Sequence, residues 1–253
     1  MSNVEEKLAR SLTGESTAII PYLHYLFQDL WELGAMPNEI NDLISSYIPI
    51  TKDTRILDLA CGKGAVSIGL SKSFGCRVKG IDIIPEFIDY AGEKAHEHGV
   101  ENLCHFQVED INRSIQTEKG YDIVVYAAVG DVLGDIHETI VKLKDTVVPG
   151  GYILIDDAYS NEGNHEMYAS RQQWLNAFRD TGVKLVAERT MDENTMEAVN
   201  QYNQNCIIKR AQELTTAHPD QADLFAAYIQ SQQAEINDLQ GDITGVVWLL
   251  QVI

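Results

Sequence analysis

The fold of this chain is constrained most by residues 55–67, with the sequence Arg-Ile-Leu-Asp-Leu-Ala-Cys-Gly-Lys-Gly-Ala-Val-Ser. A short apolar run ends at Asp58, a loop follows with Gly62 and Gly64, and an amphipathic segment then continues to Phe74. This pattern predicts a strand, a tight turn and a helix. The two glycines allow a sharp turn and the close approach of a ligand, and the first N–H groups of the helix are free to donate to it.

A second apolar run, residues 76–82, ends in another carboxylate, Asp82, eighteen positions after Gly64. In a doubly wound sheet, an acidic residue at this place accepts hydrogen bonds from both hydroxyls of a ribose. A dinucleotide fold favours a third glycine that seats the pyrophosphate, whereas residues 65–67 are Ala-Val-Ser. The sequence therefore weakens the prediction of a pyrophosphate-bearing cofactor.

Several motifs share one order and spacing along the chain. They are Asp58-x-Ala60-Cys61-Gly62-x-Gly64, Asp82, Glu109-Asp110, Tyr121-Asp122-Ile-Val-Val and Pro149-Gly150-Gly151. Over residues 54–160 the chain resembles the class I methyltransferases that use S-adenosylmethionine (SAM). The resemblance implies SAM as cofactor and S-adenosylhomocysteine as its product. Ala60 and Val66 stand where glycines are frequent in that family, and Val66 suggests a helix face packed on the sheet.

The fold class follows from the alternation of strands and helices together with this resemblance. We expect an α/β fold with a doubly wound, seven-stranded, mostly parallel sheet whose last strand is antiparallel. The predicted strands are 55–60, 77–82, 103–108, 122–128, 152–156, 184–190 and 243–253, and the predicted helices are 64–74, 86–98, 136–147 and 165–180. The Pro149-Gly150-Gly151 motif is interpreted as the turn into the fifth strand.

Two helical caps are expected outside this alternation. Residues 1–50 are predicted to form an N-terminal cap with helices over Ser16–Leu33 and Pro37–Tyr47. Residues 51–253 are predicted to form the Rossmann-like domain, with a helical insertion at about 192–240 before the last strand. Because the N-terminal helices precede the first strand, they could lie over its carboxyl end and close the cofactor cleft.

Composition limits the classes of partner. The formal net charge of −19 argues against a nucleic-acid or anionic membrane surface, because either would need clustered Lys and Arg. The four cysteines include no C-x-x-C pair, so they indicate neither a zinc site nor a disulfide framework, and no metal is expected. The start of the chain does not look like a leader, and no apolar run approaches about 18 residues, so the simplest location is the cytoplasm. We expect a monomer or homodimer.

The resemblance assigns cofactor-binding roles at the ends of the first four strands. Asp58 would lie near the methionine end of SAM, or alternatively only hold the turn. Asp82 would accept bonds from the ribose hydroxyls. Asp110 would accept from the adenine amino group, with Glu109 as the alternative if the register differs by one residue. The other predicted contacts are Ala60, Gly62, Gly64, Ile83 against adenine, the backbone of Ile111, and Ala127 near the reacting methyl group.

Candidates for catalysis include two residues after the fourth strand. Asp131 could hold a cationic or hydroxyl-bearing acceptor, although a polar turn also favours Asp. His137 could take a proton, because imidazole titrates near neutral pH. Asp135 and Glu138 form a capping-box pattern, however, which places His137 in the first turn of a helix and favours a surface role.

Tyrosines of the N-terminal cap and carboxylates of the fifth strand complete the candidates. Tyr22 or Tyr25 could contact the cofactor or the acceptor as catalytic residues, with simple packing as the alternative. Asp156, Asp157 and Tyr159 could form the far wall of an acceptor pocket.

The predicted function is SAM-dependent methyl transfer to a small-molecule acceptor by in-line displacement. Such a reaction mainly requires alignment of the acceptor behind the methyl carbon and exclusion of water. One alternative is a protein that binds SAM without catalysis. A less favoured alternative is an NAD-dependent oxidoreductase. The acceptor atom, the need for a general base and the pathway are left open by the sequence.

Overall fold

The computed structural model describes residues 2–161, 165 and 168–253 of the chain. These residues form a seven-stranded sheet in the order β3-β2-β1-β4-β5-β7-β6. Its strands are β1 (Arg55–Leu59), β2 (Arg77–Asp82), β3 (Cys104–Val108), β4 (Tyr121–Ala127), β5 (Val147–Ser160), β6 (Val183–Thr190) and β7 (Ile243–Val252). The first five strands pair in parallel, and β7 lies antiparallel between β5 and β6. The predicted doubly wound sheet with an antiparallel last strand is therefore confirmed.

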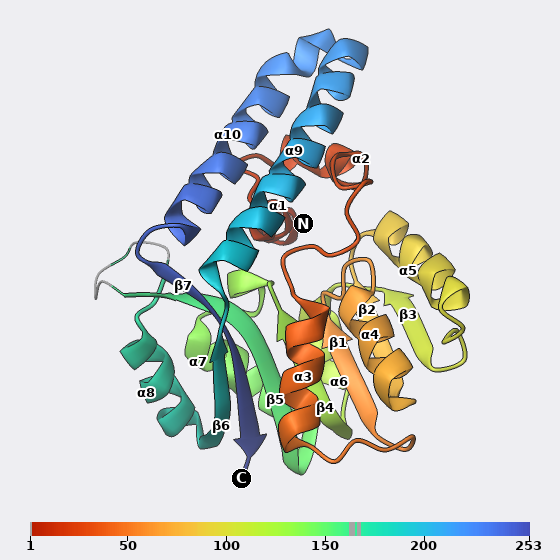
Figure 1. Cartoon of the computed structure of the whole chain (residues 1–253), viewed down its shortest axis with the longest axis vertical. Helices are drawn as coiled ribbons and strands as arrows, with labels where there is room; N and C mark the ends of the chain where they lie inside the picture. The colour runs from red at the N-terminus through yellow and green to blue at the C-terminus, as the bar shows by residue number, and fades with distance from the viewer. Residues whose placement is uncertain (1, 162–164, 166–167) are drawn as a thin grey trace.

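Helices cover both faces of the sheet (Figure 1). On one face α3 (Pro37–Tyr47) and α4 (Ala65–Phe74) pack on β1, β4 and β7, and Val66 lies in this core as predicted. The opposite face is covered by α6 (Ile111–Thr117), α7 (Ile136–Lys144) and α8 (Arg171–Thr181). At the β3 edge, α5 (Pro85–Glu97) packs against α4. The chain between strands thus supplies two helical layers and one continuous sheet.

Between β6 and β7 the chain leaves the sheet and returns. This insertion consists of α9 (Glu193–Ala217), the 3₁₀ turn η3 (Pro219–Gln221) and α10 (Ala222–Leu239). Figure 1 shows the two long helices side by side, projecting beyond the carboxyl ends of the parallel strands; we call this pair the arm. The helical insertion predicted before the last strand is present.

The N-terminal cap differs from the prediction. Pro37–Tyr47 is helical as expected, but the single helix predicted over Ser16–Leu33 is wrong. In its place are the 3₁₀ helix η1 (Thr17–Tyr22), the four-residue α2 (Leu23–Leu26) and irregular chain as far as α3. Pro21 lies inside η1, where it cannot donate a backbone N–H. The Lys63 ammonium donates to the carbonyls of Phe27 and Leu30, and the Phe27 carbonyl also accepts from the Leu30 N–H at 2.9 Å, in a tight turn and not in a continuing α-helix.

Two short helices and the extension of one strand were also absent from the prediction. The chain begins with α1 (Ser2–Ser11), and α6 follows β3; neither helix was predicted. The motif Pro149-Gly150-Gly151 lies within β5, not in a turn before it, at an irregularity in the pairing with β4 where Gly150 has a φ of 83°. Of the helix predicted over 165–180, residues 166 and 167 fall outside the described residues, and α8 begins at Arg171.

The cap and the arm share a hydrophobic core of their own. Ile19, Leu23 and Leu26 from the cap pack with Ile207 of α9 and Phe225 of α10. This core also includes Ile84 and Phe87, which follow β2, so it continues down to the end of the sheet. Among the described residues, no helix combines the length and the apolar character needed to cross a lipid bilayer.

Candidate functional site

A cavity lies at the carboxyl ends of β1, β2, β3 and β4; we call it the first cavity. Its walls are the loops that follow these strands, and α1 contributes Val4, Lys7, Leu8 and Ser11 to its lining. Eight of the nine predicted cofactor-binding residues line it: Asp58, Ala60, Gly62, Asp82, Ile83, Asp110, Ile111 and Ala127. Ligands of open α/β sheets bind at this edge, so the position suits a cofactor.

The ninth residue, Gly64, does not line the cavity but allows the close packing of the loop against the side chains of Phe106 and Ala91. It has a φ of 75° and precedes α4, and a Cβ placed there would come within 2.9 Å of the side chains of Phe106 and Ala91. Gly62 has a φ of 53° and Ala60 a φ of 57°, so two positions in the loop and its approach also take the left-handed conformation. Such backbone is costly for alanine, and strain of this kind concentrates at binding sites.

Asp82 holds the glycine loop directly. Its Oδ2 accepts from the backbone N–H of Gly62 and its Oδ1 from that of Ile84, each at 2.9 Å. The side chain is 7% exposed; burial raises its pKa, and the backbone bonds oppose that rise. Since each carboxylate oxygen has two acceptor sites, Asp82 retains capacity for two hydroxyl donors.

Asp58 is buried beneath the same loop. Its Oδ2 accepts from the Ser67 hydroxyl at 2.6 Å, which joins the end of β1 to the first turns of α4. Burial raises its pKa to about 7, the Ser67 bond lowers it, and the charge of Asp82 adds to the rise. Asp58 therefore holds the turn while lining the cavity, so both roles considered for it are compatible.

The geometry distinguishes Asp110 from Glu109. Asp110 caps α6 by accepting from the backbone N–H of Asn112 at 2.9 Å, and it lines the first cavity. Glu109 is outside that lining and accepts instead from Gln107 and Ser114. Of the two carboxylates, only Asp110 therefore lines the first cavity.

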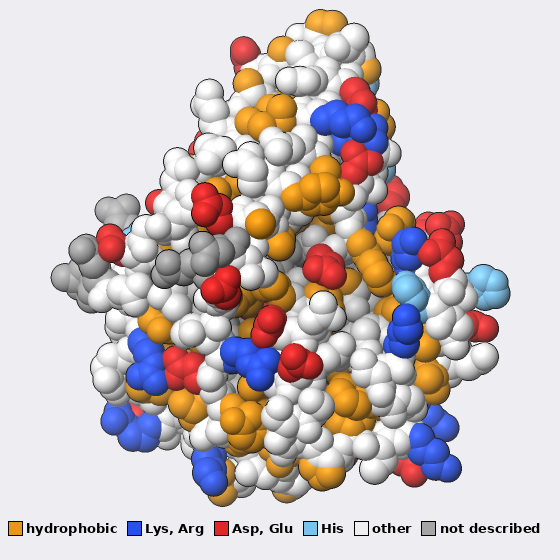
Figure 2. All heavy atoms as spheres, in the orientation of Figure 1, with side chains coloured by type: hydrophobic (Ala, Val, Ile, Leu, Met, Phe, Trp, Pro, Cys, Tyr) orange, Lys and Arg blue, Asp and Glu red, His pale blue; other side chains and the backbone are white. Residues whose placement is uncertain are grey.

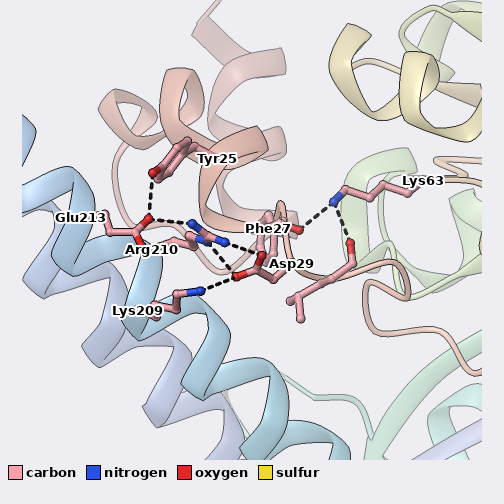
Figure 3. Close-up of polar contacts among 8 residues, drawn as sticks. Tyr25, Phe27, Asp29, Lys63, Lys209, Arg210 and Glu213 are labelled. Atoms are coloured by element: carbon pink, nitrogen blue, oxygen red, sulfur yellow. Dashed lines mark hydrogen bonds and ion pairs between the residues drawn. The ribbon is translucent and has the colours of Figure 1, made fainter. Parts of the chain in front are cut away.

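Lys63, which the sequence reasoning did not single out, ties the cap to the glycine loop. Its ammonium donates to the carbonyl oxygens of Phe27 and Leu30, both at 2.7 Å (Figure 3). It also lies 4.6 Å from the centre of the Tyr90 ring. Only 3% of the residue is exposed. Burial lowers the Lys63 pKa to about 8, against the opposing charge of Asp29. The Trp31 indole N–H also donates to the Lys63 carbonyl, at 3.1 Å.

A second set of polar contacts ties the cap to the arm (Figure 3). Arg210 of α9 forms two bonds with the Asp29 carboxylate, at 2.5 and 2.7 Å. Glu213 accepts from Arg210 at 2.7 Å and from the hydroxyl of Tyr25 at 2.8 Å. Residues 25–30 are therefore held from both sides, by the glycine loop and by α9.

A second, larger cavity of about 640 Å³ lies beside the first, between the cap, the ends of β4 and β5, and the arm. The two cavities share five lining residues: Ser11, Leu12, Leu33, Ala128 and Val129. Asp156 and Asp157 of β5 line the second cavity, as the sequence suggested for an acceptor pocket, whereas Tyr159 does not. The two cavities are therefore adjacent and meet at these residues.

The predicted catalytic residues are dispersed. Asp131 lines the second cavity and pairs with Arg10 of α1 at 2.9 Å, and both side chains are more than half exposed. His137 is exposed and lies outside both cavities. Tyr22 packs edge-on against Phe225, and Tyr25 bonds to the arm, also outside both linings. The geometry favours the packing alternative for the two tyrosines and the surface alternative for His137.

No group of three or more His, Cys, Asp or Glu side chains suited to a metal ion occurs in the part of the chain that the structure describes. Cys61, Cys76, Cys104 and Cys206 are all free thiols.

Residues 50–221 match a family model described as a methyltransferase domain. The chain is similar to the geranyl diphosphate 2-C-methyltransferase of Saccharopolyspora erythraea, with 25% identity over 117 residues that cover 44% of this chain and 39% of that protein. It is also similar to the norajmaline N-methyltransferase of Rauvolfia serpentina, with 27% identity over 107 residues, 42% of this chain and 37% of that one. The chain spans about half the length or less of the curated relatives that it matches.

Similarity to a solved structure extends over nearly the whole fold. A SAM-dependent methyltransferase from Geobacter sulfurreducens, crystallised with S-adenosyl-L-homocysteine, superposes with a TM-score of 0.77 at 18% identity. The superposition covers 92% of this chain and 98% of that one. At this identity the likeness establishes the fold.

Proposed function

Because the chain belongs to the methyltransferase-domain family, as its motifs predict, we propose that it binds SAM in the first cavity and transfers the methyl group to a small molecule in the second. The observation that carries this proposal is the shared wall: two cavities of different lining meet at Ser11, Leu12, Leu33, Ala128 and Val129. One cavity is built from the family motifs, and the other from the cap and the arm.

The residues of the first cavity fit such a cofactor. Asp82 is buried, and both of its oxygens lie beside the loop that approaches the ligand. Gly62 and Gly64 add no side chain to that loop, so its backbone can approach a ligand closely, and Asp110 and the N-terminus of α6 lie at the end where an adenine ring would be held. Bound SAM would supply an activated methyl group on a sulfonium.

The chain's own contribution is alignment and exclusion of water. A nucleophilic atom of the acceptor forms a bond to the methyl carbon while the carbon–sulfur bond breaks and its electron pair stays on sulfur, so the leaving thioether is neutral. Positioning of the two partners is the main source of rate enhancement in such a step. Closure by α1 fits this role, because Lys7 of α1 donates to the Val132 carbonyl at 2.8 Å and thereby fastens the helix beside the end of β4.

Two observations support a small molecule as the acceptor. The two related methyltransferases are named for a prenyl diphosphate and an alkaloid. On the face shown in Figure 2, the Lys and Arg side chains of described residues are scattered among acidic ones and form no continuous patch. A nucleic-acid acceptor would require such a patch.

The test is a pair of measurements on the purified protein. Calorimetric titration with SAM, S-adenosylhomocysteine and NAD should show binding of the two adenosyl ligands and none of NAD. Transfer of a radiolabelled methyl group to a library of small molecules should then identify acceptors. Binding of NAD alone would reject the proposal in favour of an oxidoreductase, and SAM binding without transfer to any acceptor would favour a non-catalytic SAM-binding protein.

A further inference from the structure

The second cavity has an unusual balance of charge. Four carboxylates line it: Asp131, Asp156, Asp157 and Glu235. The described lining contains one basic side chain, Arg10, and its guanidinium is bonded to both oxygens of Asp131 at 2.9 and 3.0 Å. Three carboxylates therefore share a cavity in which no described lysine, arginine or histidine neutralises them.

Two acceptor atoms in this cavity have no partner among the described residues. Asp156 is 4% exposed, and its Oδ2 accepts no hydrogen bond from a described residue. Gln204 of α9 is 2% exposed, and its Oε1 likewise accepts none. Gln204 is held in place by its own amide N–H, which donates to the Ile229 carbonyl at 3.2 Å. A buried acceptor without a donor carries a free-energy cost, which a ligand that supplies donors would remove.

The position of Asp156 places it beside the cofactor. It pairs with Ala127 across β5 and β4, and its carbonyl accepts from the backbone N–H of Ala128 at 2.9 Å. Ala127 and Ala128 both line the first cavity. A group bound at the Asp156 carboxyl would therefore lie at the junction of the two cavities.

From this arrangement we propose that the acceptor is an amine-bearing small molecule, whose ammonium group donates to Asp156 and Gln204 and is stabilised by the negative charges of Asp157 and Glu235. The inference rests on the proposed function, since it names the chemical class that the second cavity takes. An ammonium group offers three donors and a positive charge, and it matches both the orphaned oxygens and the excess of carboxylates.

The electrostatic state of the carboxylates agrees with a cationic ligand. Burial raises the Asp156 pKa to about 8, the charge of Asp157 raises it further, and a backbone bond from Met36 opposes the rise. Burial likewise raises the Asp157 pKa to about 6, with the bond from Ala158 opposing and the charge of Asp131 adding to the rise. The cavity is therefore unfavourable to a further anion and favourable to a cation that would restore the charged form of Asp156.

The rest of the lining defines the body of the ligand. Met191, Met196, Val199, Ile207 and Leu239 give the cavity an apolar portion. The indole N–H of Trp174, 5% exposed, also has no partner among the described residues, so the cavity accommodates one acceptor atom on the ligand besides its donors. An amine with an apolar body meets these conditions.

The experiment compares three probes of one shape: 2-phenylethylamine, 2-phenylethanol and phenylacetate. Their binding to the protein saturated with S-adenosylhomocysteine is measured by saturation-transfer NMR and titration. We expect the amine to bind roughly tenfold or more tightly than the alcohol, because a charge-assisted bond replaces a neutral one, and phenylacetate to bind most weakly. Equal binding of amine and alcohol, tighter binding of phenylacetate, or no binding of the amine would overturn the inference.

Variants then test the assigned residues. Asp156→Asn and Asp157→Asn should each reduce the preference for the amine over the alcohol several-fold, whereas Asp89→Asn, an exposed carboxylate on α5 outside both cavities, should preserve it. An undiminished preference in both cavity variants would contradict the assignment. S-adenosylhomocysteine binding is measured in the same samples. If the wild-type protein does not bind S-adenosylhomocysteine, the proposed function is rejected. If it binds S-adenosylhomocysteine but shows no preference for the amine, only this inference is rejected.

Discussion

The two cavities of this protein are built in different ways. The first is built mainly from loops that each follow a neighbouring parallel strand and carry the family's motifs, and α1 and the chain before α3 complete its lining. The second combines α1, the irregular chain after α2, β5 and both helices of the arm, so its residues lie up to 229 positions apart, from Arg10 to Leu239. The comparison teaches that one cavity can be recognised from local sequence motifs, while the cavity beside it depends on segments that are distant in the sequence.

The largest effect on ligand affinity is expected from removing the Asp82 carboxylate from the first cavity. Asp82→Ala deletes the acceptor for the Gly62 and Ile84 N–H groups and for the ribose hydroxyls, each charge-assisted bond contributing roughly 1.5–3 kcal/mol. We expect S-adenosylhomocysteine affinity to fall about 10- to 100-fold in calorimetry. Asp89→Ala on the exposed side of α5 is the control. Unchanged affinity in a folded Asp82→Ala protein would remove this residue from the cofactor site.

Lys63→Met tests the contact that joins the cap to the glycine loop of the first cavity. The substitution keeps an apolar stem but removes the donor of the Leu30 carbonyl and one of the two donors of the Phe27 carbonyl, which costs about 1–3 kcal/mol. We expect lower stability in urea denaturation and faster proteolysis within residues 23–36. Lys72→Met, an exposed lysine on α4, should change neither. Equal proteolysis of both variants would show that the cap is held by its apolar core alone.

Stability should depend on pH through carboxyls of both cavities. Burial raises the pKa of Asp58 to about 7 and that of Asp156 to about 8, whereas unfolded aspartates titrate near 3.8. Between these values the folded protein binds more protons than the unfolded chain, so this contribution is complete below about pH 4 and is lost as pH rises to 8. We expect the free energy of unfolding to decrease over this range by on the order of 1 kcal/mol per pH unit.

Asp156→Asn separates the two regions in that measurement. An amide does not titrate, so the variant should show a shallower decline between pH 6 and 8. The part that remains would come mainly from Asp58 of the first cavity, with a smaller part from Asp157 near pH 6. A decline identical to that of the wild-type protein would show that Asp156 does not titrate in this range.

The smallest effect is expected at His137, which is exposed and lies outside both cavities. His137→Ala should change the free energy of unfolding by less than about 0.5 kcal/mol and leave the rate of methyl transfer unaltered. A large loss of turnover with unchanged stability would show that this histidine takes part in methyl transfer although it lies outside both cavities.

The sheet could be predicted well because its signals are local. Apolar runs that end in Asp58 or Asp82, followed by turn glycines, specify strand, loop and helix within about 30 residues, and the strand order follows from parallel crossovers. The antiparallel β7 came from the family resemblance and a strongly β-forming terminal run.

The cap could not be predicted because distant groups decide its conformation. The apolar residues of segment 16–33 are spaced as in a helix. In the structure, however, the Lys63 ammonium donates to two carbonyls of this segment, and Arg210 of the arm binds the Asp29 side chain. Tertiary contacts of this kind override propensity in short segments. Asp110 could have indicated α6 as its N-cap, yet the same side chain had been interpreted only as a ligand for adenine.

The shared wall has a kinetic consequence. Ser11 and Leu12, at the end of α1 and just beyond it, border both cavities, and the same helix is fastened to Val132. If a ligand enters the first cavity by displacing α1, the same movement opens the surface of the second cavity. Entry and exit would then follow a compulsory order, in which a molecule in the second cavity holds the one in the first until it departs, and steady-state rates would report the opening of residues 2–12 as much as the chemical step.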